Sequence, residues 1–211
     1  DRDRLVGEVG AAYREYGFCG FVNHGVPDRV VLEAYAVSRK FFALPDAVKR
    51  KYRSGAGGQR GYTPFGPEHA RDGAVPDLKE FWHVGREMGR ENPWPDILEP
   101  NFWPEEVPGF REKSLALYRS LDALGNRILE IIALSLELPP GWFAGHVRHG
   151  NSILRAIHYP PIANPETPAV RAARHEDINL ITLLPGSREA GLEILARDGS
   201  WVPVSQIPGT M

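Results

Sequence analysis

Little in the sequence is typical of secreted, membrane-bound or nucleic-acid-binding proteins. One cysteine, Cys19, in 211 residues excludes an internal disulfide framework and is typical of a reducing cytoplasm. No apolar run approaches the roughly 18 residues of a membrane span, and the first residues do not resemble a signal peptide. The formal net charge is −2 and no basic block is present, so neither nucleic acid nor an anionic membrane is an expected partner. We therefore expect a cytoplasmic protein, and the sequence indicates no oligomeric state.

Several common catalytic motifs are also absent. The sequence has no Gly-x-Gly-x-x-Gly dinucleotide loop, no phosphate-binding Gly-x4-Gly-Lys-Ser/Thr, no Cys-x-x-Cys and no Gly-x-Ser-x-Gly nucleophile elbow. Chemistry that depends on these motifs therefore finds no support in this chain.

Apolar residues at three- and four-residue spacing predict helices in the first two thirds of the chain. One helix is expected over residues 5–16 and another over residues 28–42, with Asp28 as its N-cap. A further helical turn is expected after Pro45. The strongest pattern, residues 111–138, carries a stripe of leucine and isoleucine that we assign to core packing.

Alternating or continuous apolar runs predict strands, mainly in the later part of the chain. Strands are expected at residues 18–23, 78–85, 152–159 and 178–184, and a hairpin at residues 191–204 around the turn signal Asp198-Gly199. Helices first and antiparallel strands later predict an α+β chain whose sheet carries the functional site.

Glycine and proline dominate residues 54–76, which predicts a long loop of the kind that often serves as a functional lid. Aromatic side chains in and after this segment have two possible roles, as parts of a lid over the site or as ordinary core filling. They are Tyr62, Phe65, Trp94 and Trp103.

The segment "RHEDINLITLLPG" carries the most specific chemical signal. In a strand, side chains at i and i+2 point to the same side, so His175 and Asp177 would face one point. One imidazole and one carboxylate suit Fe(II) held by two histidines and a carboxylate, which leaves three coordination positions open. Seven histidines and 27 acidic residues predict about one chance His-x-acid triplet in this length, so a surface charge cluster is the alternative.

Successive motifs along nearly the whole chain resemble those of the isopenicillin N synthase-like family of iron(II)/2-oxoglutarate oxygenases. In order, they are "GFVNHGVP", "FFALP", "RGYTPFG", "DLKEFWHVG", "NPWP", "LRAIHYPP", "HEDINLITLLPG" and "GLEILARDGSWVPVSQIPGT". The resemblance implies a double-stranded β-helix (jelly-roll) core preceded by N-terminal helices, with iron at one mouth of the barrel. It divides the chain into an N-terminal helical and loop region, residues 1–110, and a long helix with the first jelly-roll strands, residues 111–211.

The resemblance also implies roles for individual residues. His175 and Asp177 match the first two iron ligands of the family. Tyr159 matches a tyrosine that points toward the carboxylate of the cosubstrate or substrate. Arg155, on the same face of its predicted strand, lines the pocket in some relatives, and a structural salt bridge is the alternative. Asn179 faces the same way by alternation and would bind a ligand or a neighbouring strand.

Two family landmarks have no counterpart here, namely the second iron-binding histidine and the Arg-x-Ser pair that binds the 2-oxoglutarate carboxylate. Both lie downstream of the matching region in the family, so we expect the chain to be truncated within the barrel. The other histidines are expected to be structural or solvated: His24, His69, His83, His146, His149 and His158.

The function implied by the resemblance is an Fe(II)- and 2-oxoglutarate-dependent dioxygenase. It would oxidise C–H bonds of a small substrate, with a carboxylate-bearing molecule as one option, using dioxygen and releasing succinate and CO2. The metal would supply the oxidising power, and no side chain is assigned a separate catalytic role. Two alternatives stay open: an isopenicillin N synthase-type oxidase without 2-oxoglutarate, and a degenerate, non-catalytic binding module. Arg60 and Arg155 hint weakly at an anionic substrate, and the type of oxidation is not readable.

Overall fold

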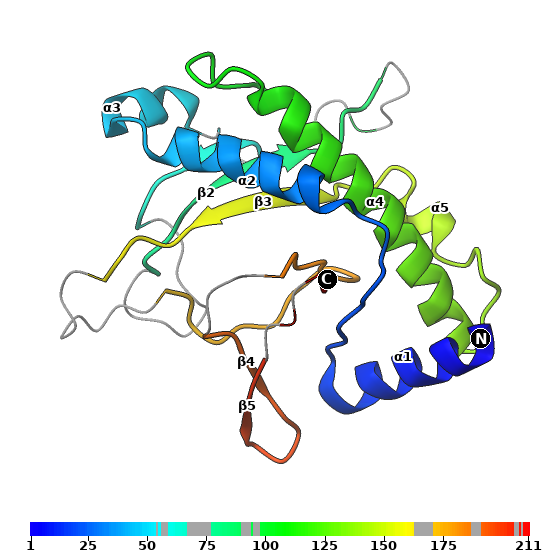
Figure 1. The fold of residues 1–211 in the computed structure, drawn as a ribbon. Helices are drawn as coiled ribbons and strands as arrows, with labels where there is room; N and C mark the ends of the chain where they lie inside the picture. Colours follow the sequence, from blue (N-terminus) through cyan, green and yellow to red (C-terminus); the bar gives the residue numbers. More distant parts are fainter. Residues whose placement is uncertain are drawn as a thin grey trace. The chain divides into compact units, whose positions relative to one another are not determined.

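The computed structural model describes most of the chain. The described residues are 1–53, 55, 59–66, 77–89, 94, 98–162, 171–186, 191–204, 207 and 209–211. Five α-helices, one 3-10 helix and five strands lie within them, and every strand pair is antiparallel (Figure 1). The predicted α+β class is therefore confirmed.

The chain forms two compact units. One contains residues 29–119 and 149–180, and the other contains residues 1–28, 120–148 and 181–211. The long helix α4 (Phe110–Ser135) is divided between them: its residues up to 119 belong to the first of these units, and its residues from 120 belong to the second. The predicted division of the chain at residue 110 stays a prediction.

The unit that contains residues 29–119 and 149–180 is built on a three-stranded sheet. Its strands are β1 (Gly61–Thr63), β2 (Glu80–Gly85) and β3 (Ile153–His158), in the order β1-β2-β3. Its helices are α2 (Asp28–Phe42), α3 (Asp46–Lys49), the 3-10 helix η1 (Arg50–Tyr52) and the start of α4. These elements confirm the helices expected over residues 28–42 and after Pro45, and the strands expected at 78–85 and 152–159.

One face of this sheet is covered by α2 and the beginning of α4 (Figure 1). The ring of Phe41 on α2 makes edge-on contacts with Tyr62, Trp82 and Phe110, with ring centroids 4.7–5.8 Å apart. Edge-to-face aromatic contacts of this kind add to the free energy gained by burial. The core of the unit therefore lies between the helices and this face, as the apolar spacing of α2 predicts.

The opposite face of the sheet bears the residues at odd positions of β2 and β3. Phe81 pairs with Ile157, and His83 pairs with Arg155, in the antiparallel register. Because side chains alternate along a strand, the pattern of β3 places Arg155, Ile157 and Tyr159 on this same side. This face carries two of the five predicted site residues.

The other unit combines helices with a hairpin. Helix α1 (Arg2–Tyr16) is capped by Asp1, whose carboxylate accepts a hydrogen bond from the Asp3 amide at 3.2 Å, and it ends at Gly17. Gly10 allows α1 to approach the end of α4, because a Cβ there would come 2.8 Å from the Cβ of Ser135. The unit also contains α5 (Ala144–Val147).

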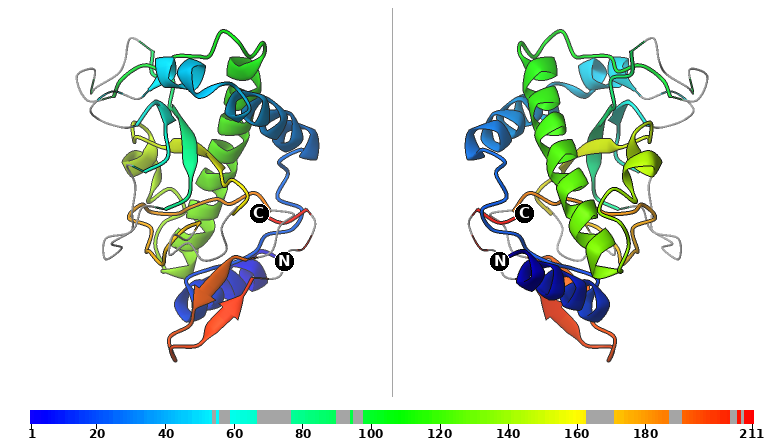
Figure 2. Two further views of the ribbon diagram at one scale, coloured as in Figure 1. Left: turned by 90° about the vertical axis from the view of Figure 1, so that its left-hand side faces the viewer. Right: turned by 90° about the vertical axis from the view of Figure 1, so that its right-hand side faces the viewer.

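Strands β4 (Glu193–Leu195) and β5 (Trp201–Pro203) form the predicted hairpin, coloured orange and red in Figure 2. In its turn, Gly199 has a positive φ of 86°. The carboxylate of Asp198 accepts hydrogen bonds from both the amide and the hydroxyl of Ser200. The Asp-Gly signal was therefore a correct predictor of the turn.

Two predicted strands are wrong. Residues 18–23 form no strand; Phe21 instead exchanges two backbone hydrogen bonds with Met211. Residues 178–184 also form no strand, and Ile178 is fully exposed, with a relative accessibility of 103%. An apolar run becomes a strand only where a neighbouring strand pairs with its backbone, and neither run has such a ladder among the described residues.

Among the helices that the structure describes, none is both long enough and apolar enough to cross a bilayer.

Candidate metal and cosubstrate site

His175 and Asp177 lie close together, as predicted. Nε2 of His175 is 3.7 Å from Oδ1 of Asp177, and both side chains are about half exposed. The segment that carries them is irregular, so the strand alternation that predicted their common direction is not what brings them together.

The proton of the His175 imidazole is placed by a local contact. Nδ1 lies 2.8 Å from the carbonyl oxygen of Ala173. A carbonyl oxygen can only accept, so Nδ1 carries the proton and Nε2 is left with its lone pair when the ring is neutral. Nε2 is also the nitrogen that faces Asp177. This is the arrangement found in metal-binding histidines, whose other nitrogen donates to a carbonyl or carboxylate.

The pair fits two adjacent positions around a divalent transition metal. Bonds of about 2.1 Å at right angles put two donor atoms roughly 3 Å apart, and the observed separation is 3.7 Å. A small side-chain rotation closes that difference, because both groups are exposed. No group of three or more His, Cys, Asp or Glu side chains able to hold a metal is found within the described ranges, so these residues supply a pair of donors and not a complete set.

The chain just before His175 is tied to the start of β2 by Asp77. Oδ1 of Asp77 accepts a hydrogen bond from the Ala173 amide at 3.3 Å, and Oδ2 forms an ion pair with Lys79 at 2.9 Å. Both charged side chains are buried. The sequence analysis missed this contact, and the acid and base at i and i+2, at the start of a predicted strand, were the only local sign of it.

Arg155 is held against two rings of β2. Its guanidinium carbon lies 4.5 Å from the centroid of Phe81, and its Nε donates to Nε2 of His83 at 2.6 Å. Contact with an aromatic face and a ring nitrogen fixes the orientation of the guanidinium group. Arg155 shares one face of β3 with Ile157, as the alternation predicted, and it is exposed.

His83 was expected to be structural, and its environment supports that expectation. The side chain is buried, and its Nε2 accepts from Arg155, so a neutral imidazole carries its proton on Nδ1. His158 is also bound within the fold, with Nδ1 at 2.8 Å from Oε1 of Glu80. His69 lies outside the described residues.

Tyr159 and Asn179 are both exposed. Tyr159 directly follows β3 and keeps the alternation of that strand, which supports its predicted position. Asn179 was placed beside His175 and Asp177 by strand alternation, and that reasoning fails because the segment is not a strand. A role for either residue in binding a ligand stays a prediction.

Arg60 does not offer a free cation to a substrate. It is buried, and its guanidinium group donates to the carbonyls of Glu99 and Gln59 and to the side-chain amide of Asn151. Burial lowers the pKa of this arginine, and no carboxylate is among these three partners. The prediction that Arg60 binds an anionic substrate was therefore wrong, because its N–H groups are hydrogen-bonded to Glu99, Gln59 and Asn151 within the fold.

The four aromatic residues of the suggested lid differ in burial. Tyr62 belongs to the core cluster and Trp103 packs against it, so both fill the core. Phe65 and Trp94 are exposed. Most of the segment around them lies outside the described residues.

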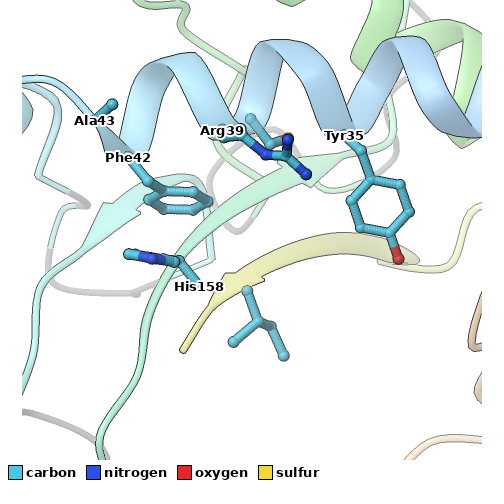
Figure 3. Close-up of a pocket in the computed structure, with 7 residues that line it drawn as sticks. Tyr35, Arg39, Phe42, Ala43 and His158 are labelled. Carbon is cyan, nitrogen blue, oxygen red and sulfur yellow. The ribbon is translucent and has the colours of Figure 1, made fainter. Parts of the chain in front are cut away.

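A cleft of about 290 Å³ lies between α2 and β3 (Figure 3). Its lining residues are Tyr35, Ser38, Arg39, Phe42, Ala43, Ile157 and His158. The ring of Phe42 stacks on His158 at a centroid distance of 5.4 Å. None of the five predicted site residues lines this cleft, so it is distinct from the candidate metal pair.

Comparison with known proteins agrees with the sequence motifs. The family model for the N-terminal region of non-haem dioxygenases in morphine synthesis matches residues 1–106, and the model for the 2OG-Fe(II) oxygenase superfamily matches residues 150–211. A crystal structure of a 2OG-Fe(II) oxygenase family protein from Caulobacter crescentus is 43% identical, with a TM-score of 0.90; the match covers 100% of this chain and 68% of that one.

Two further relatives are more distant. A full-length protein from Neurospora crassa, solved in complex with alpha-KG and thymine, is 26% identical with a TM-score of 0.83, over 98% of this chain and 67% of that one. Proline hydroxylase buaE from Petromyces alliaceus is 33% identical over 97% of this chain and 66% of its own length.

The chain spans just under two thirds of the curated relatives, with 66% of buaE and 62% of the 2-oxoglutarate-Fe(II) type oxidoreductase hxnY from Emericella nidulans covered. These matches confirm the family that the motifs indicated. The chain belongs to the 2-oxoglutarate- and iron(II)-dependent oxygenase superfamily.

Proposed function

We propose that this protein is an iron(II)- and 2-oxoglutarate-dependent oxygenase that oxidises a C–H bond of a small molecule. In a hydroxylation, substrate, 2-oxoglutarate and dioxygen give the hydroxylated product, succinate and CO2. The observation that carries the proposal is the His175–Asp177 pair, with its 3.7 Å separation and an imidazole whose Nδ1 is already bound to a carbonyl. Family membership supplies the context that a lone His-x-Asp triplet lacks.

His175 and Asp177 would hold the iron, which supplies the redox chemistry when bound. A neutral imidazole and one carboxylate leave a ferrous site with a net positive charge from these two ligands. Such a site favours a chelating, anionic cosubstrate such as 2-oxoglutarate. Dioxygen is the second cosubstrate.

Arg155 and Tyr159 are proposed to bind a carboxylate of the cosubstrate or substrate, and Asn179 to hydrogen-bond a ligand. The support for Arg155 is its fixed orientation over Phe81 and beside His83. A cation that is already ordered loses little conformational entropy when it binds an anion. Two related structures contain small molecules, thymine in the Neurospora crassa protein and JA in JOX2, which supports a small-molecule substrate.

We also propose that the sheets belong to a jelly-roll core, with residues 1–110 as the helical region and 111–211 as the long helix and first jelly-roll strands. The TM-score of 0.90 to the Caulobacter crescentus oxygenase supports this fold. The proposed location is the cytoplasm, on the basis of the single cysteine.

The two alternatives are less well supported. The names of several relatives specify 2-oxoglutarate dependence, which disfavours an oxidase that does not use it. The two candidate iron donors, Nε2 of His175 and Oδ1 of Asp177, lie 3.7 Å apart, which favours a metal-binding oxygenase over a non-catalytic module.

The proposal is tested by an anaerobic Fe(II) titration of the complete protein and of three variants. His175→Ala and Asp177→Ala should each weaken iron binding at least 10-fold, whereas Glu176→Ala should not, because Glu176 serves as the matched exposed control between them. Succinate release from 2-oxoglutarate in the presence of oxygen should fall in parallel. If both ligand variants kept wild-type affinity, the assignment would be refuted.

A further inference from the structure

Asp77 is a buried carboxylate that joins two segments distant in the sequence. Its Oδ2 lies 2.9 Å from Nζ of Lys79, just before β2, and its Oδ1 accepts from the amide of Ala173 at 3.3 Å. The side chains of Asp77 and Lys79 are 3% and 10% exposed. The carboxylate therefore has both oxygens engaged inside the fold.

Both backbone polar groups of Ala173 form hydrogen bonds with side chains. Its amide donates to Asp77, and its carbonyl oxygen accepts from Nδ1 of His175 at 2.8 Å. The two polar groups of one residue thus connect the buried carboxylate to the candidate iron ligand. If Ala173 shifts, the acceptor that fixes the imidazole shifts with it.

We propose that Asp77 is a positioning residue for His175, acting through the backbone of Ala173. Asp77 holds Ala173 in place, and the carbonyl of Ala173 then keeps the proton of His175 on Nδ1 and presents Nε2 to the metal. The role toward the metal rests on the proposed function. The effect on the imidazole proton does not, because it is a property of the protein alone.

The charge of Asp77 is central to this role. A hydrogen bond to an ionised carboxylate is stronger than one to a neutral acceptor. Lys79 offsets the cost of burying that charge. An asparagine at this position has only one side-chain oxygen, and its carbonyl is a weaker acceptor than a carboxylate. Its NH2 group would face either Lys79 or the Ala173 amide, so one of the two contacts would be lost.

A merely structural role for Asp77 makes a different prediction. An ion pair that only stabilises the start of β2 would change the unfolding free energy and leave the His175 imidazole unaltered. The tautomer of His175 therefore distinguishes the two roles.

The first measurement uses the metal-free protein. Long-range 1H–15N spectra, recorded where imidazoles are neutral, should show His175 as the Nδ1–H tautomer in the wild type, with its signals assigned by their loss in His175→Gln. In Asp77→Asn the signals should move toward a mixture of tautomers. Glu87→Gln is the matched control, since it removes an ion pair with Arg111 just after β2 and does not contact Ala173.

The second measurement is Fe(II) affinity. Asp77→Asn should bind iron about 10- to 100-fold more weakly, the range seen when the outer partner of a metal-bound histidine is lost. Glu87→Gln should bind like the wild type. If Asp77→Asn is unfolded by circular dichroism, Ala173→Pro decides, because it removes the amide donor and leaves the Asp77–Lys79 pair intact.

The outcomes separate the two claims. The positioning role would be overturned if Asp77→Asn kept the wild-type tautomer of His175 and the wild-type Fe(II) affinity, even if His175→Ala loses iron. If Asp77→Asn is unfolded, the same result in Ala173→Pro would overturn it. Full iron binding by His175→Ala would instead overturn the proposed function, and the metal-free spectra would still decide the role of Asp77.

Discussion

The ammonium group of Lys49 on α3 lies 2.8 Å from Oε2 of Glu80 on β2, and the two side chains are only 5% and 1% exposed. The same carboxylate accepts hydrogen bonds from the hydroxyl of Tyr62 on β1 and from Nδ1 of His158 on β3. Burial and the bond to Glu80 raise the pKa of Tyr62 far above its usual value, so its hydroxyl stays protonated and donates. One buried carboxylate therefore joins α3, β1 and β3 to β2.

Removal of the positive partner should be costly. Lys49→Met keeps most of the aliphatic stem but leaves Glu80 buried without its cation, which destabilises proteins by about 3–5 kcal/mol. Lys51→Met is the control, because Lys51 and Glu106 form an exposed pair, and exposed ion pairs contribute little to stability. Urea denaturation measures the loss of unfolding free energy in each variant. If Lys49→Met lost no more than Lys51→Met, the buried Lys49–Glu80 pair would not be a major source of stability.

Arg155 offers a test of carboxylate binding. Arg155→Lys keeps the charge but loses the planar group that stacks on Phe81 and the Nε–H that reaches His83. We expect the KM of one carboxylate-bearing ligand to rise about 10-fold, equivalent to about 1.4 kcal/mol. Separate titrations of 2-oxoglutarate and of the substrate identify which ligand Arg155 binds.

The exposed Arg148, at the end of α5, provides the control for that measurement. Arg148→Lys should leave both KM values unchanged. Unchanged values in Arg155→Lys as well would show that Arg155 serves the sheet and not a ligand.

Much of the fold was predictable where short-range patterns determine it. The apolar spacing in residues 28–42 predicted the buried side of α2, and the alternation in residues 152–159 predicted which side chains of β3 share a face. The Asp198-Gly199 turn predicted the hairpin. In each case the pattern reflects a periodicity of one element or the φ requirement of one turn, so no distant partner had to be known.

The errors and omissions all involve distant partners. Whether residues 178–184 form a strand depends on a neighbouring strand, and their apolar pattern does not specify one. The contacts of Asp77 with Ala173, and of Glu80 with Lys49, join residues 96 and 31 positions apart. For the site, the sequence predicted the His175–Asp177 pair, and the backbone contact that fixes the imidazole was visible only in the structure.

Glu33 on α2 should contribute a pH-dependent part of the stability. A hydrogen bond from Lys113 at 2.6 Å, together with the positive charges of Lys113 and Arg29, lowers the pKa of this carboxyl in the folded state, against a smaller opposing effect of burial. A lowered folded-state pKa means that the stabilisation is complete above the unfolded-state pKa of about 4.3. It is lost as the pH falls through the folded-state pKa.

A comparison of the wild type with Glu33→Gln tests the direction of this pH dependence. The wild type should be more stable at neutral pH, and the difference should shrink as the pH falls below the unfolded-state pKa and through the lowered folded-state pKa. Unfolding free energies from urea titrations across this range measure it. A difference that grew on acidification would contradict the lowered pKa.

Gly85, at the end of β2, is required by the close approach of Arg60. A Cβ at this position would overlap the guanidinium group of Arg60, which is buried and bound to three acceptors. The strand cannot move away freely, since the amide and carbonyl of Gly85 are both hydrogen-bonded to the side chain of Asn101 at 2.8 Å. Gly85→Ala should therefore destabilise the protein by about 1–3 kcal/mol from overpacking alone. Gly89→Ala, where the added Cβ meets open space, should change stability far less.

A double-mutant cycle identifies the source of that cost. In an Arg60→Met background the flexible side chain can move aside, so Gly85→Ala should cost much less than in the wild type. A coupling energy of about 1 kcal/mol or more between the two positions would attribute the requirement for glycine to the buried guanidinium group. Additive effects would instead attribute it to the backbone of β2, and the close packing of Arg60 would then not be the reason that position 85 carries glycine.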